Sequence, residues 1–131
     1  MMVVAGKIFR LSEALPIEEL ASRLQGYRTE EEYEEGDYRF KLVTEIVGLT
    51  TKNSNLRGIY SHDYIIHVFH RGKVIPLPRT IEAVFSFTEL KDKTLLTIVE
   101  KKRLANFIAN KMSEIIFGKA GLIVEVRIPP E

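Results

Sequence analysis

All three histidines of the chain, His62, His67 and His70, fall within nine consecutive positions that also contain Asp63. Imidazoles and carboxylates bind transition metals and transfer protons, so this is where such chemistry would be sought first. The residues between them are β-branched or aromatic, which is typical of a strand. On a strand, His62 and His70 share one face roughly 26 Å apart, and His67 points to the other face. We therefore expect no metal site here, and the imidazoles to bond locally.

Other catalytic signatures are weak. The chain contains no cysteine, which excludes disulfides, zinc–thiolate sites, iron–sulfur clusters and thiol nucleophiles. The segment "GLTTK" at 48–52 lacks the second glycine and the Lys-Ser/Thr pair of a phosphate-binding loop. Neither "FSF" nor "YSH" has the glycine frame of a nucleophile elbow. We expect no cofactor and no catalytic residue, and a binding domain is favoured over an enzyme.

Charge is unevenly distributed although the formal net charge is only +1. Residues 1–51 contain 6 basic and 10 acidic side chains, whereas residues 52–119 contain 12 basic and 6 acidic ones. Within the basic part, Lys101, Lys102 and Arg103 come together at the start of an expected helix, where they could bind a phosphate. Lys52 and Arg57 could extend this anion-binding or nucleic-acid-binding surface. The alternative is that these cations are solvated and protect strand ends from aggregation.

The strand that carries the histidines has no clearly polar face, because apolar and aromatic residues occupy both its even and its odd positions. A second apolar face needs cover. A second copy of the chain, an elongated ligand, or bases stacked on a ladder of Tyr60, His62 and Tyr64 could provide it.

The elements that would position these residues are mostly strands. Hydrophobic periodicity predicts helices at 15–26 and 102–118, and six acidic groups among residues 29–38 favour a solvated turn or short helix there. The prolines at 76 and 78 place residues 74–78 at a sheet edge or in a bend. The strands are expected at 3–11, 38–51, 57–72, 73–78, 79–90, 94–102 and 122–130.

This order, β-α-β-β-(β)-β-β-α-β, predicts an α+β fold in which a curved antiparallel sheet packs on two helices, in a single domain over residues 1–131. By order of elements alone it resembles one half of the TATA-binding-protein fold and also the helix-grip domains. Such a likeness between folds carries no function.

The function expected from these patterns is non-enzymatic binding, with single-stranded nucleic acid as the first partner to test. The alternatives are a homo-oligomeric structural or protein-interaction module, and a helix-grip-like binder of a small ligand. A homodimer is expected, and no membrane association. The absence of a signal-like N-terminus favours a cytoplasmic location. Abundant glutamate, lysine and arginine with a single glutamine favours a thermophilic source.

Overall fold

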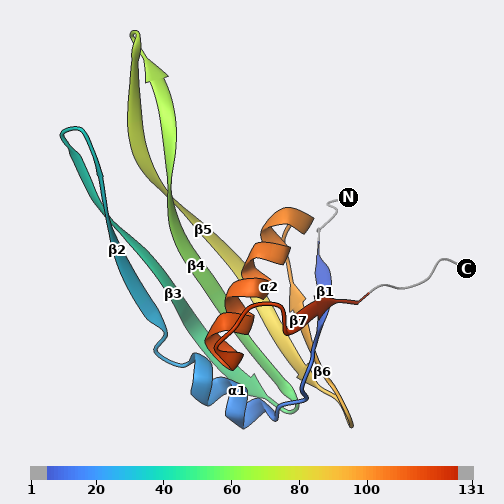
Figure 1. Cartoon of the computed structure of the whole chain (residues 1–131). Coiled ribbons are helices and arrows are strands. Elements are labelled where there is room, and N and C mark those ends of the chain that lie inside the picture. The colour runs from blue at the N-terminus through green and yellow to red at the C-terminus, as the bar shows by residue number, and fades with distance from the viewer. Residues whose placement is uncertain (1–5, 127–131) are drawn as a thin grey trace, which may run out of the picture.

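The computed structural model describes residues 6–126, which form one seven-stranded antiparallel sheet and two helices (Figure 1). The strands lie in the order β2-β3-β4-β5-β6-β1-β7. The elements are β1 (Lys7–Leu11), α1 (Ile17–Leu24), β2 (Arg28–Glu35), β3 (Tyr38–Lys52), β4 (Asn55–His70), β5 (Lys73–Glu89), β6 (Thr94–Ile98), α2 (Lys102–Phe117) and β7 (Ile123–Glu125).

The mixed α+β class is as predicted, but two assignments differ from the expected order. The acidic segment expected as a turn or short helix is strand β2, which pairs with β3 along its whole length. Residues 73–78, expected as a separate piece, are the first part of the continuous strand β5. The two differences offset each other, so the number of strands agrees although their identities do not. The expected strand residues 3–5 and 127–130 lie outside the described part of the chain.

The prolines of β5 sit at an edge of the sheet, as their lack of an N–H requires. Val99 donates its N–H to the carbonyl of Val84, so the even-numbered residues of β5 direct their backbone groups away from β4. The register with β4 is unbroken along β5, so the nitrogens of the even-numbered Pro76 and Pro78 also point away from β4. Strand β6 pairs only with residues 85–89, so the two prolines face a part of the edge that β6 does not cover.

Both helices pack on one face of the sheet, which we call the front face (Figure 1). Leu20 and Leu24 of α1 and Ile108 and Met112 of α2 are fully buried against it. Helix α2 begins as the periodicity predicts and ends at Gly118, whose φ of 82° is the left-handed conformation that glycine favours. Neither helix of the described chain is both long and apolar enough to cross a membrane.

The helices are fixed by capping interactions from distant parts of the chain. Pro16 at the start of α1 provides no side-chain cap, and the carboxylate of Glu89 accepts the N–H of Ile17 instead, at 2.8 Å. Arg23 of α1 donates to the carbonyl of Ile116 at the end of α2, at 2.7 Å. These bonds lock the helices to each other and to one end of the sheet.

Phe85 packs over Gly58 of the neighbouring strand in the core. A Cβ added at Gly58 would lie 2.7 Å from the ring of the fully buried Phe85 and 2.9 Å from the side chain of Leu49. Gly58→Ala should lower the free energy of unfolding by about 1–3 kcal/mol through overpacking. Gly6→Ala is the control, because its Cβ would meet only an ordinary contact at 3.6 Å. Urea denaturation of both variants measures the difference, and equal stabilities would contradict this packing.

Candidate functional site

His62 and His67 bond to separate neighbours. His62 Nδ1 lies 2.8 Å from Thr44 Oγ1 on β3, and its ring contacts Phe107 of α2 at 5.5 Å between centroids. His67 Nε2 lies 2.8 Å from Glu35 Oε1 on β2. Within residues 6–126, no three histidine, aspartate or glutamate side chains are arranged to hold a metal ion. Burial under α2 lowers the pKa of His62, which favours the neutral imidazole near pH 7.

The structure corrects the expected stacking ladder at its first residue. Tyr60 is only 1% exposed in the core beneath the helices, so its ring has no open face for a base. Burial also raises the pKa of Tyr60, which keeps its hydroxyl protonated. His62 stacks on Tyr60 at 6.3 Å and is partly covered by Phe107. Of the three expected residues, Tyr64 lies farthest along β4 from the buried core and is half-buried.

The expected basic surface is divided into two parts. Lys101, Lys102 and Arg103 are exposed at the start of α2, and no acidic residue lies in the first helical turn. Arg57 is opposite Ser86, five residues along β4 from His62, or roughly 17 Å at the rise of a strand. It also lies on the face opposite to Tyr60, because odd and even residues of β4 alternate.

Lys52 lies still farther away, at the β3–β4 turn. Lys52 and Arg57 therefore do not extend the cluster at the start of α2, which corrects the expectation of a continuous patch. Sequence spacing could not show this, because it depends on the register of the ladder and on where α2 crosses the sheet.

A shallow apolar hollow of about 410 Å³, widely open to solvent, lies beside the first turns of α2, and we call it the cavity. Sequence reasoning placed cations there but missed the cavity, because it forms only where the helix leaves the sheet surface. Its lining comes from β5 and from the start of α2: Ile81, Glu100, Lys101, Arg103, Leu104 and Phe107. Figure 1 shows this end of α2 on the side from which the long hairpins extend. The cavity thus marks where the helical cover of the front face stops.

Beyond this boundary the sheet divides into two hairpins. The β3–β4 ladder reaches only to Thr44 opposite His62, whereas β2–β3 and β4–β5 continue to their turns. We call residues 29–44 the β2–β3 arm and residues 62–81 the β4–β5 arm. Both are visible as projecting hairpins in Figure 1. Nearer the turns, the contact between His67 and Glu35 connects the two arms.

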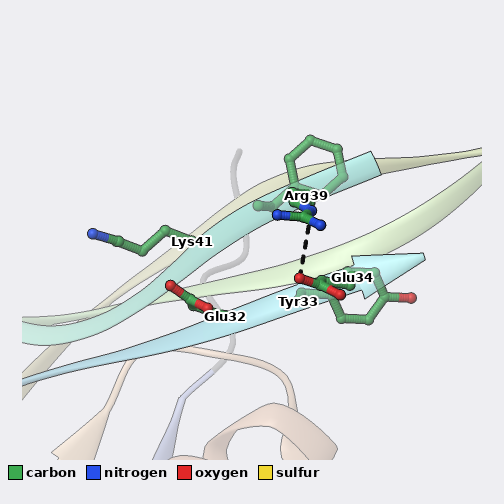
Figure 2. A pocket seen from close by; sticks show the side chains of 6 residues that line it. Glu32, Tyr33, Glu34, Arg39 and Lys41 are labelled. Atoms are coloured by element: carbon green, nitrogen blue, oxygen red, sulfur yellow. Dashed lines mark ion pairs between the residues drawn. The ribbon is translucent and has the colours of Figure 1, made fainter. Parts of the chain in front are cut away.

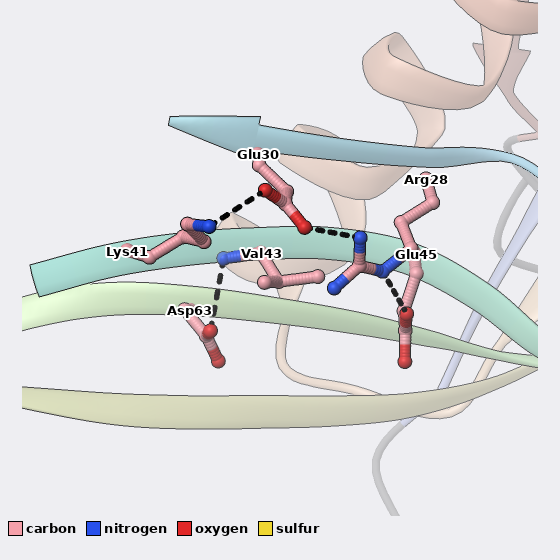
Figure 3. Close-up of polar contacts among 6 residues, drawn as sticks. All are labelled: Arg28, Glu30, Lys41, Val43, Glu45 and Asp63. Atoms are coloured by element: carbon pink, nitrogen blue, oxygen red, sulfur yellow. Dashed lines mark hydrogen bonds and ion pairs between the residues drawn. The ribbon is translucent and has the colours of Figure 1, made fainter. Parts of the chain in front are cut away.

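Asp63 stabilises the point of division. Its Oδ2 accepts the N–H of Val43 at 2.9 Å (Figure 3). Its Oδ1 accepts the hydroxyl of Thr80 at 2.6 Å. A side chain thereby satisfies a β3 backbone donor just where the ladder between β3 and β4 ends. The Thr80 hydroxyl and the Val43 N–H both stabilise the carboxylate, and so lower the pKa of Asp63.

The β2–β3 arm is charged and held by cross-strand ion pairs. Glu30 pairs with both Arg28 and Lys41, and Arg28 also reaches Glu45 at 3.2 Å (Figure 3). Nearer the turn, Arg39 lies 3.4 Å from Glu34 beside a shallow pocket (Figure 2). The side chains of this last pair are 80% and 59% exposed, so it contributes little to stability. The charged lining of this pocket is explained by these pairs and carries no further chemistry.

The β4–β5 arm, in contrast, is apolar on both faces. Phe69 and Val74 are directly opposite each other near its turn and are 74% and 56% exposed. Leu77, on the other face, is 40% exposed. The remaining apolar side chains of the arm are Tyr64, Ile65, Ile66, Val68, Ile75, Pro76, Pro78 and Ile81. A two-stranded ribbon with two apolar faces cannot bury both by itself.

Comparison with protein-family models, with curated proteins and with solved structures finds no match. A function can therefore be proposed only from the arms, the basic cluster and the cavity of this chain.

The role of Asp63 at the point where the sheet divides can be tested. Asp63→Ala should lower the free energy of unfolding by about 1 kcal/mol, because it leaves the Val43 N–H and the Thr80 hydroxyl without their acceptor. The folded pKa of Asp63 lies below its unfolded value, so its stabilising effect is present above about pH 4 and is lost as the pH falls through the folded pKa.

Chemical denaturation from pH 7 to pH 3 measures this dependence. Asp63→Asn serves as the control, because it retains one acceptor oxygen but cannot titrate. The wild type should lose more stability than Asp63→Asn on acidification, and parallel curves for the two proteins would contradict the assigned role.

Proposed function

We propose that this chain is a non-enzymatic interaction module that self-associates through its β4–β5 arm. The observation that carries the proposal is the exposure of large apolar side chains on both faces of one projecting hairpin. Phe69 and Val74 lie on one face and Leu77 on the other. Exposed apolar patches of this kind mark interaction sites in proteins that remain folded in water.

A second copy of the chain is the partner that the charges favour. The β2–β3 arm contains six acidic and two basic side chains, whereas the β4–β5 arm contains one acidic and three basic ones. Each copy thus carries two surfaces of opposite charge, and a two-fold axis would bring each arm of one copy to the complementary arm of the other. A stable dimer of this type should bury about 1,200 Å² or more in total.

The prolines of β5 limit how the copies can meet. Pro76 and Pro78 direct their nitrogens toward the uncovered edge and cannot donate hydrogen bonds to an added strand. Association by extension of the sheet at this edge is therefore disfavoured. Packing of side chains on the faces of the arm remains, which is where the exposed apolar residues lie.

A second candidate function is the binding of single-stranded nucleic acid. One observation supports it: Lys101, Lys102 and Arg103 are all exposed and lie within three consecutive positions near the exposed Phe107. Tyr60 is buried, and Lys52 and Arg57 lie far from the start of α2. The nucleic-acid candidate therefore has fewer contact residues than the sequence suggested. The acidic β2–β3 arm of the same chain also opposes a polyanion.

Self-association is tested by replacing Phe69 and Val74 with serine. Both side chains are exposed, so the variant should remain folded while its mass in light scattering changes from dimer to monomer at micromolar concentrations. Val124→Ser is the matched control, because Val124 is 50% exposed on β7, away from the arms, and should leave the dimer intact. A monomeric wild type, or a dimeric double variant, would rule the proposal out.

The nucleic-acid candidate is tested by fluorescence anisotropy with single-stranded DNA and RNA. If it is correct, Lys101→Glu/Lys102→Glu/Arg103→Glu abolishes binding, and the wild-type affinity falls by roughly 0.7 log unit per log unit of salt for each phosphate contacted. Lys52→Glu/Arg57→Glu should bind as the wild type does. No binding by the wild type at low salt would leave the three cations as a surface without a nucleic-acid role.

A further inference from the structure

We propose that the cavity beside the start of α2 binds a small amphipathic anion, with its apolar part against Ile81, Leu104 and Phe107 and its charged group at Lys101 and Arg103. This inference does not rest on self-association. It concerns a different surface, where the arms join the helix-covered part of the sheet.

The walls of the cavity suit an apolar group. Ile81 comes from β5, whereas Leu104 and Phe107 lie three residues apart on α2 and therefore share one side of the helix. Phe107 is 38% exposed, unusually open for a phenylalanine on the helix that covers the core. Its ring is held by His62 on one side, at 5.5 Å, and by the ammonium group of Lys111, at 5.8 Å. The exposed part of this ring presents apolar surface to the cavity.

Two positively charged side chains that are exposed to water border the cavity. Lys101 and Arg103 line it, and the described residues place no carboxylate within ion-pair distance of either side chain. The one acidic residue of the lining, Glu100, accepts the backbone N–H of Lys101 at 3.4 Å. Arg79 lies two residues before Ile81 on the same face of β5 and adds a third exposed cation.

Size and charge together select the ligand class. A cavity of about 410 Å³ falls within the range of small-molecule sites, roughly 300–1,000 Å³. Apolar walls and a cationic rim complement a molecule with one apolar chain and one anionic head, either a carboxylate or a phosphate. An uncharged apolar molecule would make no ion pair with Lys101 and Arg103, and a free anion would leave the apolar walls exposed to water.

The test is calorimetric titration of the full chain with dodecanoate below its micelle concentration, beside dodecyl phosphate, dodecanol and inorganic phosphate. The expected result is saturable binding of one dodecanoate or dodecyl phosphate per chain. Dodecanol should bind about tenfold more weakly or worse, because it lacks the charge-assisted bonds to the rim. Inorganic phosphate should not bind measurably.

Variants then locate the site. Lys101→Glu/Arg103→Glu should weaken dodecanoate binding about tenfold or more. Lys52→Glu/Arg57→Glu changes the net charge by the same amount at the far end of β4 and should have no effect. Leu104→Gln should weaken dodecanoate and dodecanol alike, and Phe69→Ser/Val74→Ser should bind as the wild type does even if it is monomeric. Equal binding of dodecanoate and dodecanol, equal loss in both charge-reversed pairs, or no saturable binding would overturn the proposal.

Discussion

The length of the β4–β5 ladder determines the shape of the rest of the molecule. The sixteen residue pairs from Asn55 opposite Thr88 to His70 opposite Lys73 extend about 50 Å at the rise of a strand. Helix α2 has 16 residues and spans about 24 Å, and α1 has only 8. The helices therefore cover about half of the ladder. The other half must project into water or against a partner.

Several features meet at the row where this cover ends. His62 and Ile81 face each other there on the front face, and Phe107 closes over them from α2. In the next row, Asp63 and Thr80 lie opposite each other on the other face of the sheet, and Asp63 accepts the N–H of Val43 on β3. The lowered pKa values of His62 and Asp63 have different causes, burial for the imidazole and hydrogen bonding for the carboxylate. Because adjacent residues of a strand point to opposite faces, these two groups do not converge on one cavity.

How much could be predicted from the sequence depended on the range of the interactions. Local patterns identified α2, the strand that contains the histidines and the edge position of Pro76 and Pro78, since each follows from periodicity or backbone chemistry. The acidic residues of β2 were misassigned because a strand in a two-stranded arm can be polar on both faces and be held by cross-strand ion pairs such as Glu30 with Lys41. The burial of Tyr60 and the separation of Arg57 from Lys101 depend on where a helix crosses a ladder. That relation is set by tertiary packing and leaves no local signal.

The same length mismatch separates the two surfaces that we assign to binding. The cavity lies at the inner end of the β4–β5 arm, next to the buried core, and its walls are supported by α2. Phe69 and Val74 lie near the arm's turn, seven residues along the ladder from His62 and Ile81. At the rise of a strand this is roughly 23 Å. A small ligand in the cavity therefore leaves the tip of the arm free, and a partner held only at the tip leaves the cavity open. Only a partner that also covered Arg79 and Leu77 on the front face would approach the cavity and make the two sites compete.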